Sequence, residues 1–256
     1  MRGLLVSDLH YALKQFDWVH GVADRFDLVV IAGDSLDIAS AVALGAQIVV
    51  VSKYLRRVGA RTRLITSSGN HDLNARGADG ERIATWLAKD RVPGVLTDGD
   101  YIEIGDTAIT VCRWWDGPLG RDEVGRQLAR DAARRKARDT RWLWVYHAPP
   151  DRSPVSWTGS KYYGDAELVE WIERYRPDVV LSGHVHQSPF RLGGSWADRI
   201  GDTWVFNAGR EWAPEPAHVV FDTAARTAAW TSTLGEQMLR LDEPFTRPAA
   251  PPVTPS

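Results

Sequence analysis

Aspartate, histidine and asparagine side chains occur in five short groups along the chain, and such side chains supply the oxygen and nitrogen donors of metal sites. The five groups contain Asp8 and His10, Asp34, Asn70 with His71 and Asp72, His147, and His184 with His186. A mixture of carboxylate, amide and imidazole donors suits Mn, Fe, Ni or Zn better than calcium or magnesium. The residue types therefore indicate a metal centre that several distant parts of the chain build together.

The number of donors exceeds what one ion uses, so two ions that share Asp34 are the most economical arrangement. Two cations about 3.5 to 4 Å apart lower the pKa of a bridging water, bind a phosphoryl oxygen and stabilise the charge of an in-line displacement. Single motifs such as His-x-His or Gly-Asp occur by chance in many proteins. Their combination, each at the end of a predicted strand, argues against coincidence.

Buried strands of an α/β fold must position these groups. Each group follows an apolar run, and the runs are Gly3 to Val6, Leu28 to Ala32, Arg63 to Ile65, Leu143 to Val145 and Val179 to Leu181. In open α/β sheets, ligands gather outside the carboxyl ends of the strands. We therefore expect the five groups to converge in space although they are distant in the sequence.

Helical patterns alternate with these strands, as is typical of α/β architecture. We expect helices over residues 14–25, 39–58, 80–89, 121–138 and 166–175. Turn dipeptides predict an antiparallel hairpin of residues 101–104 and 107–112. Short β-rich segments around Phe190 and over residues 204–206, 219–221 and 229–231 predict a closing antiparallel sheet. We expect one domain over residues 1–243 and a Pro-rich, disordered tail over residues 244–256.

The order Asp-x-His, Gly-Asp, Gly-Asn-His-Asp, His and Gly-His-x-His resembles the calcineurin-like metallophosphoesterase family, from Ser7 to His186. The resemblance implies an α/β fold, a four-layer sandwich of two mixed β-sheets flanked by α-helices. It also implies that one metal is bound by Asp8, His10, Asp34 and His186, and the other by Asp34, Asn70, His147 and His184. The segment Asn207-Ala208-Gly209 resembles the family's Asn-x-Gly segment after the last site loop.

Two residues beside the predicted ligands are candidates for catalysis. His71 follows Asn70 and is absent from the ligand set, so we expect it to protonate the leaving oxygen or to stabilise the transition state. Asp72 either holds the tautomer of His71 or caps the next segment. Asp37 is three residues beyond Asp34, and we expect it to make loop hydrogen bonds outside the metal set.

These residues predict a dinuclear metal-dependent phosphoesterase that acts by attack of a metal-bridging hydroxide. We expect a small, cyclic nucleotide-like phosphodiester, because the chain is small and has no lid domain. Three alternatives stay open: a phosphomonoesterase or phosphoprotein phosphatase, a nuclease, and a non-catalytic, metal-stabilised interaction scaffold. The complete ligand set argues against the scaffold. Five residues form either an aromatic wall suited to a nucleotide or a packed loop: Trp114, Trp115, Trp157, Lys161 and Tyr162.

Charge and composition restrict the partners. The net charge of -2 and the pI of about 6.4 argue against duplex DNA or an anionic membrane as a partner held by bulk electrostatics. We therefore expect a small phosphate ester as the partner. Arginines at positions 126, 130, 134 and 138 form one side of a predicted helix, and either they bind phosphates of a nucleic acid or they are a solvated face. The sequence does not indicate an oligomeric state.

The cysteine content and the apolar runs bear on the cell compartment. Cys112 is the only cysteine, which excludes an intrachain disulfide and a thiolate zinc site, and we expect it to be buried. Leu4 to Val6 is too short for the apolar part of a signal peptide. No other run approaches the roughly 18 apolar residues of a membrane helix. We therefore expect a cytoplasmic protein.

Overall fold

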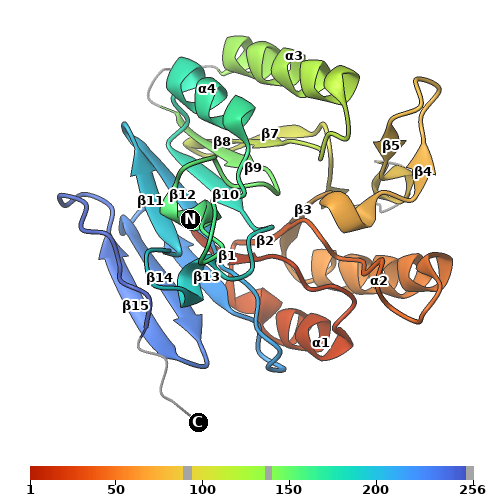
Figure 1. Ribbon diagram of the computed structural model, residues 1–256, viewed down its shortest axis with the longest axis horizontal. Coiled ribbons are helices and arrows are strands. Elements are labelled where there is room, and N and C mark those ends of the chain that lie inside the picture. Colours follow the sequence, from red (N-terminus) through yellow and green to blue (C-terminus); the bar gives the residue numbers. More distant parts are fainter. Residues whose placement is uncertain (89–93, 136–139, 252–256) are drawn as a thin grey trace.

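Two β-sheets pack face to face in the computed structural model, which describes residues 1–88, 94–135 and 140–251 (Figure 1). The first sheet contains, in spatial order, β15 (Gly235–Arg240), β14 (Thr227–Ser232), β13 (His218–Asp222), β1 (Arg2–Val6), β2 (Leu28–Ala32), β3 (Arg63–Ser67) and β6 (Val95–Leu96). The second contains β11 (Ala197–Ile200), β12 (Thr203–Asn207), β10 (Val179–Ser182), β9 (Arg141–Val145), β8 (Thr107–Val111) and β7 (Tyr101–Ile104). Both sheets mix parallel and antiparallel neighbours.

The central strands are buried on both faces, which explains their unbroken apolar sequences. In β1, Leu5 points into the core between the sheets and Leu4 contacts the outer helices. In β10 of the second sheet, Leu181 likewise points into the core between the sheets, and Val180 contacts the outer helices. Successive residues of a strand point to opposite faces, so a parallel strand covered on both sides is apolar at every position.

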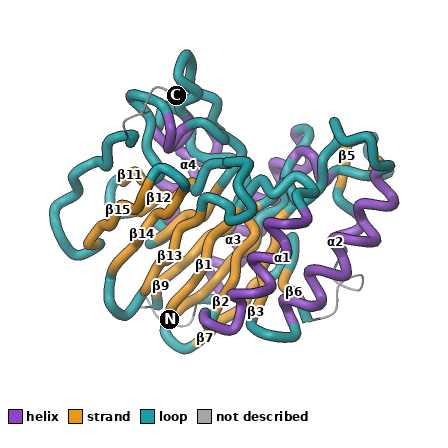
Figure 2. The backbone as a smooth tube through the Cα atoms, turned by 90° about the horizontal axis from the view of Figure 1, so that it is seen from below, coloured by secondary structure: helices purple, strands orange, loops and turns teal. Residues whose placement is uncertain are grey.

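The α-helices of the described residues cover the outer faces of the two sheets (Figures 1 and 2). The helices α1 (Leu13–Val22) and α2 (Leu44–Gly59) pack on the first sheet, and α3 (Pro118–Arg134) and α4 (Ala166–Tyr175) pack on the second. This confirms the predicted four-layer sandwich of two mixed β-sheets flanked by α-helices. Asp165 caps α4 by accepting hydrogen bonds from the N–H groups of Glu167 and Leu168 at 2.9 and 3.3 Å, which starts this helix at its predicted residue.

The helix predicted over residues 80–89 is wrong. The segment instead contains a hairpin of β4 (Ala75–Arg76) and β5 (Arg82–Ile83), followed by a 3₁₀ turn at Thr85–Leu87. Lys89 and Pro93, where that helix was expected to end, lie outside the described residues. The Glu81 carboxylate accepts hydrogen bonds at 2.8 Å from the N–H groups of Leu119 and Gly120, at the start of α3. A contact with a distant segment thus overrides the local helical pattern.

Two other helices begin at residues that differ from the prediction. The helix expected from residue 39 begins at Leu44, because the Gln47 side chain binds the backbone of Asp37 and Val42 at 2.8 to 2.9 Å and holds the preceding loop. The helix expected from residue 121 begins at Pro118. Arg138, the last arginine of the predicted ridge, lies outside the described residues, and Arg134 lies 3.7 Å from Asp131.

The predicted closing antiparallel sheet is confirmed only in part: β13 and β14 pair antiparallel, but the C-terminal strands divide between the two sheets. In the second sheet, β12 pairs in parallel with β10, whereas β13 to β15 extend the first sheet. The segment around Phe190 is a 3₁₀ turn. The hairpin of β7 and β8 is confirmed, and Cys112 is buried.

Residues 244–251 contain neither helix nor strand, and Phe245 contacts Trp204 edge to face with ring centroids 5.2 Å apart. The division at residue 243 stays a prediction. Over the part of the chain that the structure describes, no helix combines the length and the apolar character needed to cross a bilayer. The cytoplasmic location stays a prediction as well.

Candidate metal centre

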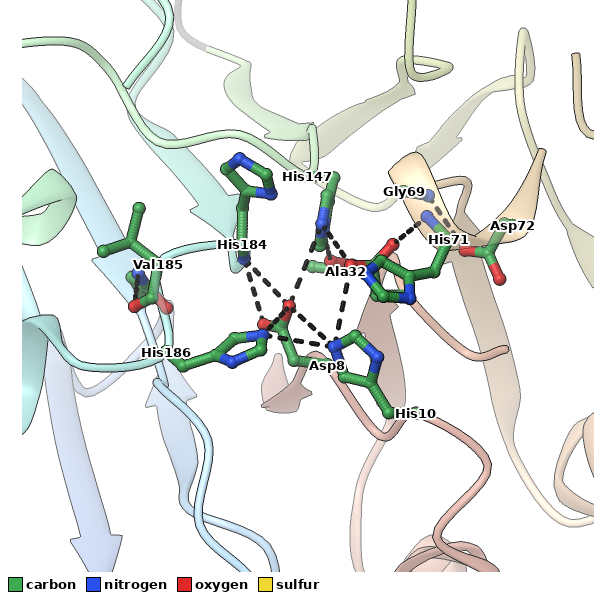
Figure 3. Close-up of polar contacts among 12 residues, drawn as sticks. Asp8, His10, Ala32, Gly69, His71, Asp72, His147, His184, Val185 and His186 are labelled. Atoms are coloured by element: carbon green, nitrogen blue, oxygen red, sulfur yellow. Dashed lines mark hydrogen bonds and ion pairs between the residues drawn. The ribbon is translucent and has the colours of Figure 1, made fainter. Parts of the chain in front are cut away.

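The predicted ligands follow the carboxyl ends of β1, β2, β3, β9 and β10. Figure 3 shows five of them, Asp8, His10, His147, His184 and His186, close to one another. Asp8 Oδ1 lies 3.2 Å from His186 Nε2, and Asp34 Oδ2 lies 3.2 Å from His147 Nε2. His10 Nε2 lies 3.1 Å from His186 Nε2 and 3.7 Å from Asp34 Oδ2. Side chains up to 176 positions apart in the sequence therefore contact one another.

Six of the seven predicted metal ligands fall into two groups whose donor atoms lie within 4.8 Å of one another. The groups are Asp8, His10 and His186, and Asp34, His147 and His184. In a third group, the donor atoms of His10, Asp34 and His71 also lie within 4.8 Å of one another. Asp34 thus lies between the two ligand groups, and the seventh predicted ligand, Asn70, opens the 3₁₀ turn that follows β3.

Two buried polar atoms test whether these residues fit metal ions. Asn70 Oδ1 is buried without a hydrogen-bond partner among the described residues, and the buried His147 Nε2 makes no hydrogen bond there although the Asp34 carboxylate lies 3.2 Å away. An unsatisfied buried polar atom costs about 1–3 kcal/mol. His147 Nδ1 binds the carbonyl of Ala32 at 2.7 Å, which turns Nε2 towards Asp34, as an oriented metal ligand requires. The unpaired atoms and the donor set therefore fit metal coordination.

Backbone conformation helps to aim the ligands. Asp8, His10, Asp34 and His184 have φ angles of 56, 41, 51 and 67°, in the left-handed region that side chains other than glycine rarely adopt. Such conformations cost about 1–3 kcal/mol each and persist where the surroundings hold them. Backbone hydrogen bonds from Asp8 to Gly33 (3.1 Å) and from His10 to Asp34 (2.9 Å) tie the two loops together. Strain therefore concentrates at the predicted ligands.

Glycines next to the ligands permit the strand ends to approach. A Cβ atom on Gly33, whose φ angle is +83°, would overlap the ring of His147. One on Gly69 would overlap the Asp34 carboxylate, and one on Gly183 would overlap Ser7 and Asp8. Steric crowding thus explains why a glycine precedes the predicted ligand in the Gly-Asp, Gly-Asn and Gly-His pairs of the sequence.

Charges within the centre shift several pKa values. Burial raises the pKa of Asp8, but hydrogen bonds and charges of His10, His186 and His147 outweigh it and hold that pKa well below its ordinary value. Burial lowers the pKa of His184 to about 4, with a contribution from His147, so this ring is neutral. Burial also lowers the pKa of His147, but the Asp34 charge raises it to about 9. Since metals bind neutral imidazole, His147 must release a proton when it binds one.

The two predicted catalytic residues have different surroundings. His71 Nδ1 accepts a hydrogen bond from the Ile38 N–H at 3.3 Å and lies 3.7 Å from Asp37 Oδ1. The fully buried Asp72 carboxylate accepts hydrogen bonds from the N–H groups of Gly69 (2.8 Å), Leu36 (3.0 Å) and Ser35 (3.4 Å). These bonds correspond to the alternative in which Asp72 caps a segment. The capped segment is the 3₁₀ turn that contains Asp72, and not the segment that follows it. Asp37 is the carboxylate beside the His71 ring.

Two residues at the rim, Arg210 and Tyr163, were not among the predicted site residues. Arg210 donates its backbone N–H to the His186 carbonyl at 3.1 Å, and its guanidinium lies 4.3 Å from the Trp212 ring centroid. Burial lowers its pKa, and the carboxylates of Asp8, Asp37 and Asp34 oppose this shift. Tyr163 stacks on His184 with ring centroids 5.0 Å apart. Arg210 directly follows Asn207-Ala208-Gly209, so its position after that segment could have indicated that it lies near the centre.

The predicted aromatic wall divides in the structure. The ring centroid of Trp114 lies 5.1 Å from that of His184, and Trp115 lies beside it in the same pocket. Trp157 and Tyr162 instead pack against each other, with their ring centroids 5.0 Å apart. Part of the wall therefore adjoins the centre, and the rest is a loop that packs on itself.

Comparisons with known proteins agree with this geometry. Residues 1–188 match the family model of the calcineurin-like phosphoesterases. The fold is similar to TT1561 of Thermus thermophilus, with a TM-score of 0.57, 12% identity and coverage of 94% of this chain and 98% of that one. It is also similar to the purple acid phosphatase PPD1 from yellow lupin (Lupinus luteus) seeds, with a TM-score of 0.56, 11% identity and coverage of 95% and 52%.

At such low identities these two similarities show a common fold alone. No curated protein matches the sequence. The family match, in contrast, spans more than half of the chain and contains all five groups of predicted ligands. The chain therefore belongs to the calcineurin-like phosphoesterase family and is a metal-dependent phosphoesterase.

Proposed function

We propose that the chain hydrolyses a small phosphodiester at a centre of two first-row metal ions. One ion is held by Asp8, His10, Asp34 and His186, and the other by Asp34, Asn70, His147 and His184. The two compact donor groups with Asp34 between them support this assignment. Bound there, two such ions supply Lewis acidity towards the phosphoryl oxygens and make water nucleophilic near neutral pH.

Two hollows, one beside His184 and one beside His186, support the proposal that the substrate is a diester and not a monoester. One hollow of about 290 Å³ includes His184, and the other, of about 480 Å³, includes His186. These histidines belong to different ligand groups. A diester has an organic arm on each side of its phosphorus, whereas a monoester has one arm. Two hollows that start from two ligand groups therefore match a diester.

His71 acts on the leaving oxygen in this proposal. Its Nδ1 accepts the Ile38 N–H, so the neutral ring carries its proton on Nε2. Burial lowers the pKa of His71 and favours this neutral form. The Nε2–H stabilises the negative charge that develops on the leaving oxygen.

Arg210 and Asp72 support the reaction from the two sides of the centre. The Arg210 guanidinium lines the hollow that includes His186, where it meets a non-ester oxygen of the substrate. The Asp72 carboxylate accepts hydrogen bonds from backbone groups of two neighbouring segments, the loop after β2 and the turn after β3. It thereby holds the segments that carry Asp34 and Asn70.

Hydrolysis of two aryl esters tests the proposal. Dialysed protein is assayed with bis(4-nitrophenyl) phosphate and with 4-nitrophenyl phosphate, with and without manganese, and metal is quantified in the same samples. We expect about two metal ions per chain and a diester preference that added manganese restores. A monoester preference would indicate a phosphatase, and two bound ions without turnover of either ester would indicate a scaffold.

A nuclease is the remaining alternative, and the arginines of α3 motivated it. Arg126 lies in a shallow groove together with the acidic side chains of Asp122 and Glu167, and Arg134 lies beside Asp131. These carboxylates reduce the attraction of the helix for a phosphate backbone. Cleavage of single-stranded oligonucleotides that Arg126→Glu weakens would favour the nuclease over the small diester.

A further inference from the structure

An aromatic pocket adjoins the metal centre on the side of His184. Trp114, Trp115, Tyr146, Tyr163 and Glu167 are among the residues that line its volume of about 290 Å³. Trp114 lies near two predicted ligands, with its ring centroid 5.1 Å from His184 and 5.6 Å from His147. A group bound in this pocket would therefore be attached close to the phosphorus of a substrate at the centre.

Three polar side chains of the pocket wall, Trp115, Tyr146 and Asp165, are already hydrogen-bonded within the protein. Trp115 Nε1–H and Tyr146 O–H both donate to Asp165 Oδ2, at 3.2 and 2.7 Å. The other oxygen of Asp165 caps α4 through the N–H groups of Glu167 and Leu168. The wall consequently presents aromatic faces to an occupant, and such faces bind planar rings.

Tyr163 shows that the pocket is more than a packed loop. Its side chain stacks on His184 at an interplanar angle of 23°, yet 54% of the residue is exposed. Lys161 Nζ lies 5.4 Å from the centroid of the same ring. A large, exposed aromatic side chain that is held in a fixed orientation is suited to stack on a ring of a ligand. Stacking of a base on an aromatic side chain is strong and does not depend on which base is bound.

We propose that this pocket binds a planar ring, carried on one ester arm of the substrate, as in a nucleotide or an aryl phosphodiester. The inference rests on the proposed function, since it takes the phosphate to bind at the adjacent centre. Trp114 and Tyr163 supply the stacking surfaces, and the His186 hollow takes the other arm. The pocket thereby selects substrates by the shape of one arm.

Binding of matched ligand pairs tests the pocket separately from catalysis. The dissociation constants of AMP and ribose 5-phosphate are measured by calorimetry on the manganese-loaded full chain, followed by those of phenyl phosphate and methyl phosphate. We expect each ring-bearing ligand to bind about tenfold more tightly than its partner, the scale of one stacking contact. The larger of the two ratios shows whether the ring is a nucleobase or an aryl group.

A neighbouring residue provides the matched control. Tyr163→Leu should reduce the preference for the ring to about twofold, and Tyr163→Phe should retain it. Tyr162→Leu changes the adjacent residue, which is 45% exposed but packs on Trp157 away from the pocket, and should leave the preference unchanged. Equal affinities within both pairs, or a preference that Tyr163→Leu does not alter, would overturn the inference.

The same samples distinguish this inference from the proposed function. Protein that prefers the ring-bearing ligands but hydrolyses no diester would refute the proposed function and leave the ring site supported. Protein that hydrolyses diesters without any preference for a ring would support the function and refute the pocket.

Discussion

The metal centre and its rim are built in two different ways. The centre is made at the ends of buried strands, and Asp8 and His147 are fully inaccessible to solvent. The rim comes from loops that follow β8, precede α4 and follow β12, and Tyr163 is 54% exposed there. Backbone conformation and glycine contacts hold the centre, whereas side-chain contacts of loop residues form the rim. Chemistry thus depends on the fold, and substrate choice depends on loops that tolerate change.

The largest effect should come from Asp34→Asn. This carboxylate lies between the two ligand groups, and the His71 backbone N–H also donates to it at 2.8 Å. We expect loss of bound metal and a fall in kcat/KM of about 10³-fold or more. Metal analysis and diester hydrolysis on one sample measure both losses. A metal-free variant with normal turnover would show that turnover does not depend on the metal centre.

His71→Ala should separate metal binding from turnover. The ring adjoins His10 edge to face, at 4.4 Å between centroids, but it is absent from the proposed ligand set. We expect the variant to keep its metal and to lose about 10²- to 10³-fold in kcat, because a proton donor is worth that much. Full activity would remove His71 from the mechanism, and loss of metal would make it a ligand.

Gly33→Ala should show that backbone packing holds the centre. Gly33 and Gly99 have nearly equal φ angles of 83 and 85°, but an added Cβ would overlap His147 at Gly33 and meet open space at Gly99. Both variants should lose about 1 kcal/mol of unfolding free energy through strain alone. Gly33→Ala should in addition weaken metal binding about 10- to 100-fold. Urea unfolding and metal titration compare the pair, and equal metal affinity in both would contradict the steric role.

The smallest effect should come from the rim. Arg210→Ala removes a guanidinium that the carboxylates of the centre influence, and we expect KM for the diester to rise about tenfold with a smaller change in kcat. Arg210→Lys should recover part of the loss because it retains the charge. Steady-state kinetics on metal-loaded protein measure both. An unchanged KM would place Arg210 outside the substrate site.

The amino-acid pattern was enough to predict the layered architecture and the edge of the sheets at which the polar groups meet. Buried parallel strands are apolar at every position, so their ends are visible in the sequence, and the polar groups after them must meet at one edge. It also indicated which side chains assemble there, from Asp8 to His186, because those residue types are costly to bury without a partner.

Features that depend on contacts between separate segments could not be predicted and are visible only in the folded chain. Glu81 binds the start of α3, so the segment around it is a hairpin and no helix forms there. Asp72 binds backbone groups of the neighbouring loop, and Asp37 is the carboxylate that faces His71. Tyr163 stacks on His184 whereas the adjacent Tyr162 packs on Trp157. Local periodicity contains no record of such partners, because each contact arises only in the folded chain.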